Sequence, residues 1–342
     1  MKISNKSDEP IIIAEVGQNH QGDLSEALKY IEIFAQSGAT VVKFQTRNNK
    51  YLFSEDAYAK EYNSENAFAK TYGAHREKLE LDPDALMVLK EECGKHGVKF
   101  MSTPFDEPSL ELLAEVGVDM IKIASFDLGN LPFISKIAQK NIPVVMSTGG
   151  GNIEDVKASV AILKESVSDI SVLHCVSEYP CPANRLGLAT IQDYITEFPE
   201  CRIGSSDHFN GILSGPVAYM LGARIFEKHV TLNRAQKGTD HSFALEPHGF
   251  SNFVRDIHRV PEMMPTKNDG SLGKEAVFQK LGKSIVASKN LNKGDKIQMD
   301  DLSGRIFSEQ HVPVRESKNF IGAVLQNSIQ QGELINYEDL QN

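Results

Sequence analysis

The sequence predicts a (β/α)8 barrel, also called a TIM barrel, followed by a small second domain. Two observations support this prediction. Eight short apolar runs, rich in Val and Ile, alternate with amphipathic stretches, as expected of parallel strands that are buried on both faces. Polar side chains stand at the carboxyl end of every run, the face on which barrel proteins build their sites. The runs are Ile11–Gly17, Val41–Gln45, Val98–Pro104, Met120–Ser125, Pro143–Thr148, Ile170–Ser177, Arg202–His208 and Ala223–His229.

The stretches between the runs have helical periodicity. After the first run, apolar residues recur at helical spacing from Asp23 to Ser37, and Gly38 ends the pattern. A doubly wound open sheet is the alternative, which is disfavoured because no strand–G-x-G-x-x-G–helix unit is present. The segment Thr46–Leu81 contains four tyrosines and is long for a connection. It is a lid, a dimer contact or, the interpretation we favour, an excursion packed on the barrel.

The composition changes after Met264. The stretch Pro265–Lys274 is rich in small and polar residues, as linkers are. Beyond it, Leu291–Leu302 aligns without gaps on Ile329–Leu340, at an offset of 38 residues. We therefore predict a barrel domain over 1–264, a linker over 265–279 and a pseudo-symmetric domain over 280–342. A domain of about 60 residues has a thin core and would gain from docking on a partner surface.

Composition and charge exclude several classes of protein. Of the 342 residues, 41% are hydrophobic and 24% charged, as in an average globular chain. No apolar run reaches the length of a membrane span, and a formal net charge of −10 argues against general nucleic-acid binding. The N-terminus has no signal-like apolar core, and the four cysteines show no C-x-x-C spacing. We expect reduced, mostly buried thiols and a cytoplasmic location.

Two lysines near strand ends, Lys43 and Lys122, predict an anion site. Lysine inside a packed parallel sheet is costly unless an anion or a carboxylate meets it. Hydroxyls at neighbouring strand ends complete a cradle for a phosphate or carboxylate, namely Thr103, Ser125, Ser147 and Ser206. Two alternatives stay open: each lysine pairs with a barrel glutamate, or one of them is a Schiff-base lysine whose pKa is depressed by desolvation.

Two histidines, His208 and His229, end the seventh and eighth runs. Because neighbouring strands lie about 5 Å apart, two imidazoles at equal height can hold one metal. Such a pair suits a weakly held, exchangeable divalent ion used as a Lewis acid rather than a structural zinc. The alternative is two histidines that are hydrogen-bonded separately.

Three further polar residues are candidates for the same site. Glu15 ends the first run and is either a general base, a sugar-hydroxyl acceptor or a salt-bridge partner of Lys43. Asp240 lies in a polar loop after the eighth run, and this loop is placed to close on a substrate. His20, in the loop after the first run, either stabilises a turn or contacts a ligand.

Eight motifs follow one another along the chain: Ala14–Gly22, Val42–Thr46, Met101–Phe105, Ile121–Ser125, Met146–Gly149, Leu173–Pro180, Ile203–His208 and Glu227–His229. In this order they resemble the sialic acid synthase (N-acetylneuraminate or nonulosonic acid synthase) family. The repeat-bearing tail is similar to that family's C-terminal antifreeze-like (SAF) domain. The resemblance covers nearly the whole chain and implies an enzyme that condenses phosphoenolpyruvate with an N-acyl hexosamine, releasing phosphate.

The resemblance also implies roles for individual residues. His208 and His229 would hold Mn2+ or Mg2+, and Glu15 and Asp240 would act on the reacting groups, with Glu15 as the nearest proton acceptor. The sugar would meet Gln45, Tyr179 and, from the tail of a neighbouring subunit in a domain-swapped homodimer, Arg305, with Arg315 as a second possibility. Phosphoenolpyruvate would be held by Lys43, Thr103, Lys122, Ser125, Ser147, Ser177 and Ser206.

The chain departs from the family's pattern at two places where ligands would be recognised. Val176-Ser177 stands where many relatives have asparagine after Cys-Thr, and Arg305 sits one position away from the usual Arg-Pro-Gly setting. The resemblance therefore implies N-acetylmannosamine or a 2,4-diacetamido sugar as the acceptor. Two other functions are the alternatives: a Schiff-base aldolase using Lys43 or Lys122, and a non-catalytic sugar-phosphate-binding protein.

Overall fold

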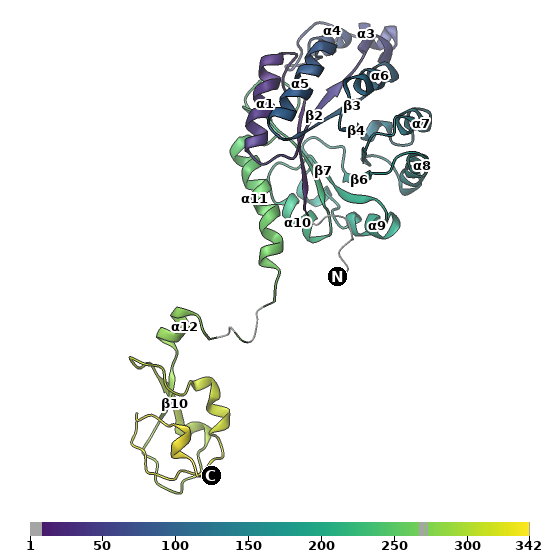
Figure 1. Ribbon diagram of the computed structural model, residues 1–342. Helices are drawn as coiled ribbons and strands as arrows, with labels where there is room; N and C mark the ends of the chain where they lie inside the picture. The colour runs from purple at the N-terminus through teal and green to yellow at the C-terminus, as the bar shows by residue number, and fades with distance from the viewer. Residues whose placement is uncertain (1–8, 267–269, 271–272, 342) are drawn as a thin grey trace. The chain divides into compact units, whose positions relative to one another are not determined.

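The structure, a computed structural model, describes residues 9–266, 270 and 273–341. Eight parallel strands form a closed barrel in chain order, and β8 pairs with β1 to close it (Figure 1). This confirms the predicted (β/α)8 barrel, and the bounds of all eight strands lie within two residues of the predicted runs. The strands are β1 Ile11–Gly17, β2 Val41–Thr46, β3 Lys99–Pro104, β4 Met120–Ile123, β5 Val144–Ser147, β6 Ile170–Cys175, β7 Arg202–Asp207 and β8 Ile225–His229.

Helices cover the outside of the barrel (Figure 1). The predicted first helix is confirmed as α1 Leu24–Gln36: the Asp23 side chain caps it by accepting from the Glu26 N–H, and the chain turns away at Gly38, where φ is +98°. The other helices of this layer are α5 Pro83–Lys95, α6 Glu107–Val116, α7 Leu131–Gln139, α8 Ile153–Lys164, α9 Thr190–Glu197, α10 Ser214–Met220 and α11 Pro247–Met263.

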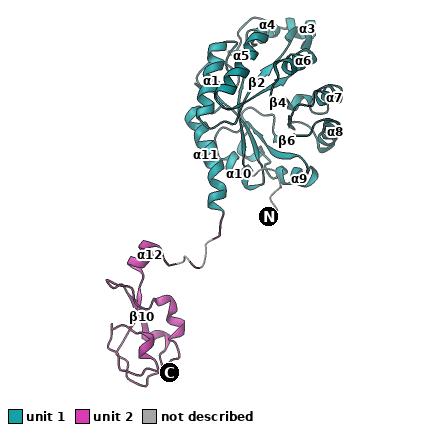
Figure 2. Cartoon of the chain, viewed as in Figure 1, with its two compact units in different colours: residues 1–264 teal, residues 265–342 magenta. Residues whose placement is uncertain are grey.

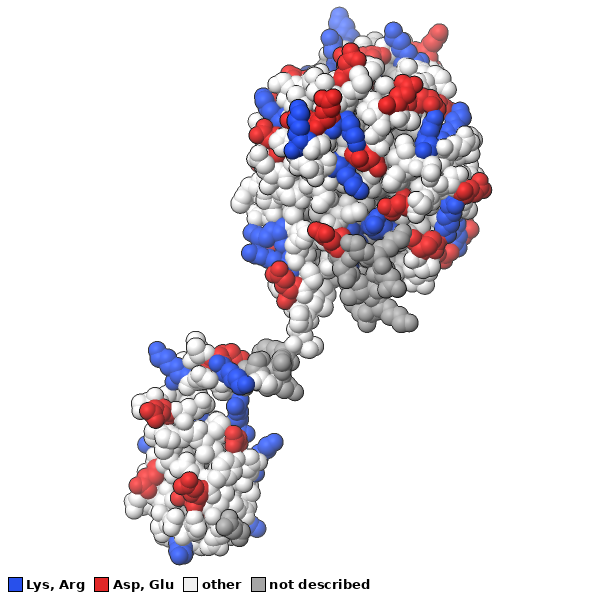
Figure 3. Space-filling view, viewed as in Figure 1, with Lys and Arg blue, Asp and Glu red and all other residues white. Residues whose placement is uncertain are grey.

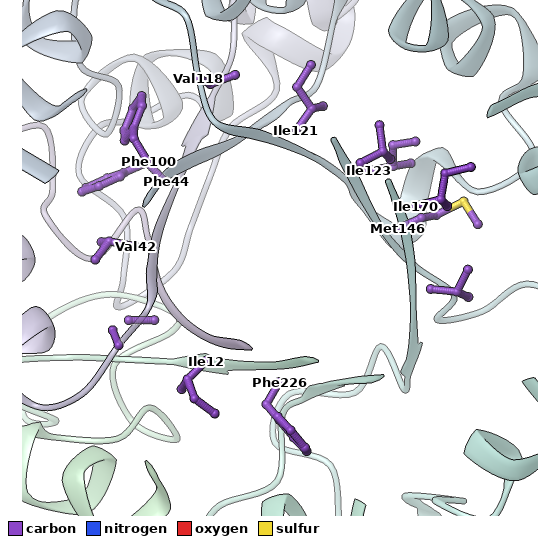
Figure 4. Packing of buried hydrophobic residues seen from close by; sticks show 14 of the residues in the cluster. Ile12, Val42, Phe44, Phe100, Val118, Ile121, Ile123, Met146, Ile170 and Phe226 are labelled. Atoms are coloured by element: carbon purple, nitrogen blue, oxygen red, sulfur yellow. The ribbon is translucent and has the colours of Figure 1, made fainter. Parts of the chain in front are cut away.

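Alternation along each strand divides the apolar residues into two cores. In β2, Val42 and Phe44 point outward into the large core between strands and helices, where Figure 4 shows them beside Phe100. Val41, one residue earlier, belongs to a separate cluster inside the barrel. Because side chains alternate across a strand, Lys43 also points inward, and the interior cluster forms a floor beneath the polar strand ends.

The segment between β2 and β3 packs on the barrel, as the favoured interpretation predicted. It forms three short helices, α2 Asn49–Leu52, α3 Glu55–Ala59 and α4 Tyr72–Glu77. Its contacts reach the loop after β8: the Asn66 Oδ1 accepts from the Gly238 N–H at 3.0 Å, and the Ala67 carbonyl accepts from Lys237 Nζ at 2.5 Å. The segment therefore fixes the position of a loop at the mouth of the barrel.

The chain divides into two compact units, residues 1–264 and 265–342 (Figure 2). The stretch predicted as a linker is grouped with the second unit, and its last residues belong to α12 Ala276–Leu281, a short helix that the composition did not reveal. The rest of that prediction lies partly outside the described residues, at 267–269 and 271–272.

The second unit contains β9 Ser284–Ala287 and β10 Leu302–Arg305, and the predicted repeat forms matching halves. Leu291 and Ile329, which occupy the same position in the two copies, exchange both backbone hydrogen bonds at 2.9 Å. Gly294 and Gly332 both have φ near +90° (+89° and +88°), which explains a glycine at the same place in each copy. The core is small, as predicted: Ile285, Ala287, Leu291, Ile297, Phe320, Leu325, Ile329 and Ile335.

Charged residues of both signs are mixed on the visible face of each unit (Figure 3). None of the described helices is long and apolar enough to span a membrane. The four cysteines are buried, as the sequence predicted.

Candidate active site

A cavity of about 450 Å³ opens at the carboxyl ends of the barrel strands. It brings together twelve of the fourteen predicted site residues: Glu15, Lys43, Gln45, Thr103, Lys122, Ser125, Ser147, Tyr179, Ser206, His208, His229 and Asp240. Ser177 is not among the lining residues, although its hydroxyl lies close behind Gly149 and Ser125. Arg305 belongs to the second unit, at the end of β10.

Two lysines and two glutamates form a buried network on the floor of the cavity. Lys43 Nζ lies 3.1 Å from Glu15 Oε2 and 3.4 Å from Glu227 Oε2, and Lys122 Nζ lies 3.8 Å from Glu227 Oε1. The alternative that each lysine pairs with a barrel glutamate is therefore realised, on residues that also line the cavity. Lys122 is the less engaged of the two, because its one hydrogen bond among the described residues is to the Ile123 carbonyl at 3.3 Å.

Burial and the charges within this network shift the pKa values of its two glutamates in opposite directions. Burial raises the pKa of Glu15 to about 7, against the opposing charge of Lys43. Burial also acts to raise the pKa of Glu227, but the charges of Lys122 and Lys43 outweigh it and hold that pKa at about 2. Burial lowers the pKa of Lys122. Glu227 is thus the permanent counter-ion, whereas Glu15 can exchange a proton near neutral pH.

Hydroxyl groups surround the lysines, and two of them lack partners. Ser147 Oγ and Ser177 Oγ are buried, and no described residue gives either a hydrogen bond. Ser206 Oγ donates to Glu227 Oε1 at 2.9 Å, and Thr103 Oγ1 accepts from Lys43 Nζ at 3.4 Å. Buried hydroxyls without partners are costly, so their presence beside a partly engaged lysine indicates a place for an oxygen-rich ligand.

A glycine keeps this part of the site open. The Gly149 N–H donates to Ser125 Oγ at 3.0 Å. A Cβ atom at Gly149 would lie 2.8 Å from Ser125 Oγ and closer still to Ser177 Oγ. Glycine at this position therefore avoids crowding both hydroxyls.

The two predicted metal ligands lie side by side. Since Asp207 pairs with Lys228 in the β7–β8 register, the next residues, His208 and His229, stand at equal height, with ring centroids 5.3 Å apart. His208 Nδ1 donates to the Val176 carbonyl at 2.8 Å, which leaves Nε2 with the free lone pair. Burial lowers the pKa of His208 to about 4 and lowers the pKa of His229 as well. Both rings are therefore neutral at pH 7, the state that binds metals.

The loop after β8 supplies the remaining polar group. Asp240 Oδ2 lies 4.0 Å from His229 Nδ1, and Asp240 Oδ1 accepts from Thr239 Oγ1 at 2.8 Å. Across the mouth, Tyr179 packs against the His208 ring at a centroid distance of 3.9 Å. His20 takes the turn-stabilising role, because its Nδ1 accepts from the Gly22 N–H at 3.1 Å and its ring is buried.

Three charged lining residues have no role in the sequence-based predictions: Glu227, Arg47 and Arg76. Glu227 shares the inward face of β8 with His229, so the two-residue period could have identified it. Arg47 directly follows β2, and its place at a strand end was a similar signal. Arg76 lies on α4, far along the chain from any strand end, and only the folded path of the segment between β2 and β3 brings it to the cavity.

Comparison with known proteins gives a consistent result. A model of the NeuB family matches residues 30–269. The chain is 36% identical to the N-acetylneuraminate-9-phosphate synthase of Drosophila melanogaster, over 96% of this chain and 95% of the relative. It is 34% identical to the N,N'-diacetyllegionaminic acid synthase of Campylobacter jejuni, over 95% and 98% of the two chains.

A solved structure agrees. The N-acetylneuraminic acid (sialic acid) synthetase of Leptospira borgpetersenii, in complex with citrate, is 31% identical and superposes with a TM-score of 0.69. The superposition covers 82% of this chain and 95% of that one.

Proposed function

Because the chain belongs to the NeuB family of sialic acid synthases, we propose that it condenses phosphoenolpyruvate with an N-acyl hexosamine. The products are a nine-carbon, sialic-acid-like sugar and inorganic phosphate. One observation favours this reaction most: the cavity joins a partly engaged lysine and the unpartnered Ser147 hydroxyl, suited to an anion, with a neutral histidine pair. An anionic donor and a carbonyl acceptor would meet between these two groups.

Phosphoenolpyruvate is assigned to the lysine side of the cavity. Lys122 has N–H groups to spare, and the Ser147 and Ser177 hydroxyls lack partners within the described part of the chain. A phosphate or carboxylate would complete these hydrogen bonds, and charge-assisted bonds are the stronger kind. The other residues of this subsite are Lys43, Thr103, Ser125 and Ser206.

A divalent metal, Mn2+ or Mg2+, is assigned to His208 and His229. The residues fit: both rings are neutral, His208 Nε2 carries a free lone pair, and the buried His229 Nδ1 has no hydrogen-bond partner among the described residues. No group of three or more His, Cys, Asp or Glu side chains in the described ranges could hold a metal, so the remaining positions would belong to water and substrate. When bound, such an ion supplies Lewis-acid polarisation of the sugar aldehyde.

The reaction then needs one base and one set of anion contacts. The methylene carbon of phosphoenolpyruvate attacks the aldehyde carbon of the open-chain sugar, the sugar oxygen takes a proton from solvent, and C2 of the former phosphoenolpyruvate becomes an oxocarbenium. Water adds to C2, and Glu15 accepts its proton, a role that suits a carboxylate with a pKa of about 7. The tetrahedral intermediate loses phosphate by C–O cleavage, while Lys43 and Lys122 stabilise the departing charge.

The sugar is assigned to Gln45, Tyr179 and Asp240 at the mouth. Gln45 is held by Glu15, whose Oε1 accepts from Gln45 Nε2 at 2.8 Å, so its position is coupled to that of the base. The acceptor is N-acetylmannosamine or a 2,4-diacetamido sugar.

The assembly that we propose is a domain-swapped homodimer in a cytoplasmic setting. In it, the tail of one subunit presents Arg305 to the sugar site of its partner. What supports this arrangement is the small core of the second unit, with eight buried apolar residues. The buried thiols of Cys93, Cys175 and Cys181 are compatible with a reducing compartment.

The test is a condensation assay. Phosphoenolpyruvate is offered with a panel of N-acyl hexosamines, and phosphate release and product mass are measured with and without manganese. We expect metal-dependent phosphate release and a product whose mass equals acceptor plus pyruvate. Absence of both with every acceptor contradicts the proposal.

A Schiff-base aldolase is the second candidate, favoured by the lowered pKa of the buried Lys122 amine. Borohydride with pyruvate separates the two, because a synthase forms no imine. A covalent adduct on Lys122 or Lys43 would favour the aldolase.

A further inference from the structure

We propose that Arg47 and Arg76 form a second anion subsite at the mouth of the cavity, and that it binds a phosphate monoester carried by the acceptor sugar. This inference rests on the proposed function and narrows its substrate class. Family membership leaves the question open, because the relatives are named for a phosphorylated product in one case and an unphosphorylated one in another.

Arg76 is a buried guanidinium with unused hydrogen-bonding capacity. It lines the cavity, is 9% exposed, and donates from Nη1 to Gln18 Oε1 at 2.7 Å. Its Nε atom is buried and finds no hydrogen-bond partner in the part of the chain that is described. Within those same residues Arg76 forms no ion pair, and the carboxylate that feels its charge, Glu80, is already paired with Arg47. A buried guanidinium without an ion-pair partner of its own is costly unless an anion meets it.

Arg47 lies in the same wall and is only partly neutralised. Its Nη1 pairs with Glu80 Oε1 at 3.4 Å, its Nη2 donates to Gln45 Oε1 at 2.5 Å, and its guanidinium stacks 3.8 Å from the centroid of the Phe105 ring. Burial and the charge of Arg76 lower the pKa of Arg47 to about 10, which reflects the proximity of the two cations. Two guanidinium groups thus share one carboxylate, and the wall keeps a net positive charge.

The arginines are connected to the sugar side of the site rather than to the lysine floor. Arg47 is hydrogen-bonded to Gln45, and Arg76 is linked through Gln18 to Thr239, which donates to Asp240. Gln45 and Asp240 are the residues assigned to the sugar. Lys43 and Lys122, by contrast, have their own counter-ion in Glu227.

The chemistry of the ligand follows from the donors. Guanidinium groups present N–H donors in a fixed fork that matches two phosphate oxygens. The aldehyde end of an open-chain hexosamine must face the reacting carbon, so the distant primary hydroxyl is where a phosphate would reach this wall. A phosphorylated acceptor thus gives the cavity two anionic ligands and two cationic subsites.

The experiment compares N-acetylmannosamine with its 6-phosphate as acceptors, each with phosphoenolpyruvate and manganese. For the native enzyme we expect kcat/KM to favour the phosphorylated acceptor by at least about tenfold, as charge-assisted contacts to a desolvated anion imply. In Arg76→Gln that ratio should fall toward one. Arg76→Lys keeps the charge but lacks the planar set of guanidinium donors, so it should give an intermediate ratio. This variant replaces Arg76→Gln in the test if Arg76→Gln fails to fold. Arg259→Gln, an exposed arginine on α11, is the charge-matched control.

Three outcomes would contradict the proposed phosphate subsite. Equal loss of activity toward both acceptors in Arg76→Gln would show that Arg76 only holds its segment in place, which refutes the subsite. An increased KM for phosphoenolpyruvate with an unchanged acceptor ratio would assign the arginines to that ligand instead. A native enzyme that uses the unphosphorylated acceptor equally well refutes the inference but keeps the proposed function. No condensation with either acceptor, or with the wider panel, contradicts the proposed function itself. Calorimetric titration of the two sugars without phosphoenolpyruvate provides a readout that is independent of turnover.

Discussion

Replacing Lys122 by methionine tests the anion subsite more sharply than any other single change. Methionine keeps the unbranched shape of the lysine stem and removes the charge. Glu227 then keeps two partners, Lys43 Nζ at 3.4 Å and Ser206 Oγ at 2.9 Å, so no carboxylate is left alone. Lys43→Met is a poorer test, because Glu15 and Glu227 would both lose the lysine as a partner. Breaking a buried ion pair in this way lowers the free energy of unfolding by about 3–5 kcal/mol.

The size of the effect follows from the contacts of the lysine. Lys122 Nζ is 3.8 Å from Glu227 Oε1, beyond hydrogen-bond distance, and gives one hydrogen bond to the Ile123 carbonyl. It therefore has N–H groups available for a ligand. Losing a hydrogen bond between charged partners costs about 1.5–3 kcal/mol, which corresponds to roughly a 10- to 150-fold weaker binding of phosphoenolpyruvate.

The assay is the KM for phosphoenolpyruvate at saturating acceptor, with binding checked by calorimetry and folding by thermal denaturation. The KM for the acceptor should change much less. Lys136→Met is the matched control, because Lys136 pairs with Glu107 at the surface and lies outside the cavity lining. A folded Lys122→Met protein with native affinity for phosphoenolpyruvate would refute the assignment of the anion to the lysine floor.

Four further predictions concern the metal site, the glycine beside the cradle hydroxyls, the buried His20 and the tail. His208→Ala should abolish turnover without unfolding the protein, and exhaustive EDTA should inactivate the native enzyme until manganese is restored. Gly149→Ala should raise the KM for phosphoenolpyruvate, because the new methyl group crowds the cradle hydroxyls, and overpacking of this kind costs about 1–3 kcal/mol. Burial lowers the pKa of His20 from 6.5 to about 4, so between these pH values the unfolded chain binds a proton that the folded chain does not. As the pH is lowered through this range, the free energy of unfolding should fall by up to about 3 kcal/mol, and His20→Gln should reduce that fall. Mixing Glu15→Gln and Arg305→Ala chains should restore activity that neither has alone, if the tail acts on the partner's site.

Each of these predictions has an outcome that contradicts it. Full activity in exhaustive EDTA would remove the metal from the reaction. Gly94→Ala, where a methyl group meets no atom within 4 Å, is the control for Gly149→Ala, and equal kinetics in the two would argue against the cradle. An unaltered pH profile in His20→Gln would place the acid sensitivity on other histidines. Mixed dimers that form and stay inactive would argue against the swapped arrangement.

The inward and outward faces of the barrel were predictable from the sequence. Side chains alternate along a strand for reasons of local geometry, so Val41, Lys43 and Gln45 had to share a face once the run was read as a strand. The same reasoning put His208 and His229 at the ends of adjacent strands, and the register of Asp207 with Lys228 bears this out. The repeat in the tail was likewise visible in the sequence, and in the structure its two first residues, Leu291 and Ile329, pair with each other.

What the sequence left open is which of these side chains neutralise one another and which remain available. Lys43 pairs with two glutamates while Lys122 keeps unused donors, because closure of the barrel sets distances across its interior that no local period encodes. Arg76 reaches the cavity because a long, irregular segment folds back over the mouth, and the path of such a segment depends on contacts with residues far away in the chain, such as that of Asn66 with Gly238. Periodicity fixes the side of a strand that a residue occupies; its partner is decided only when distant segments meet.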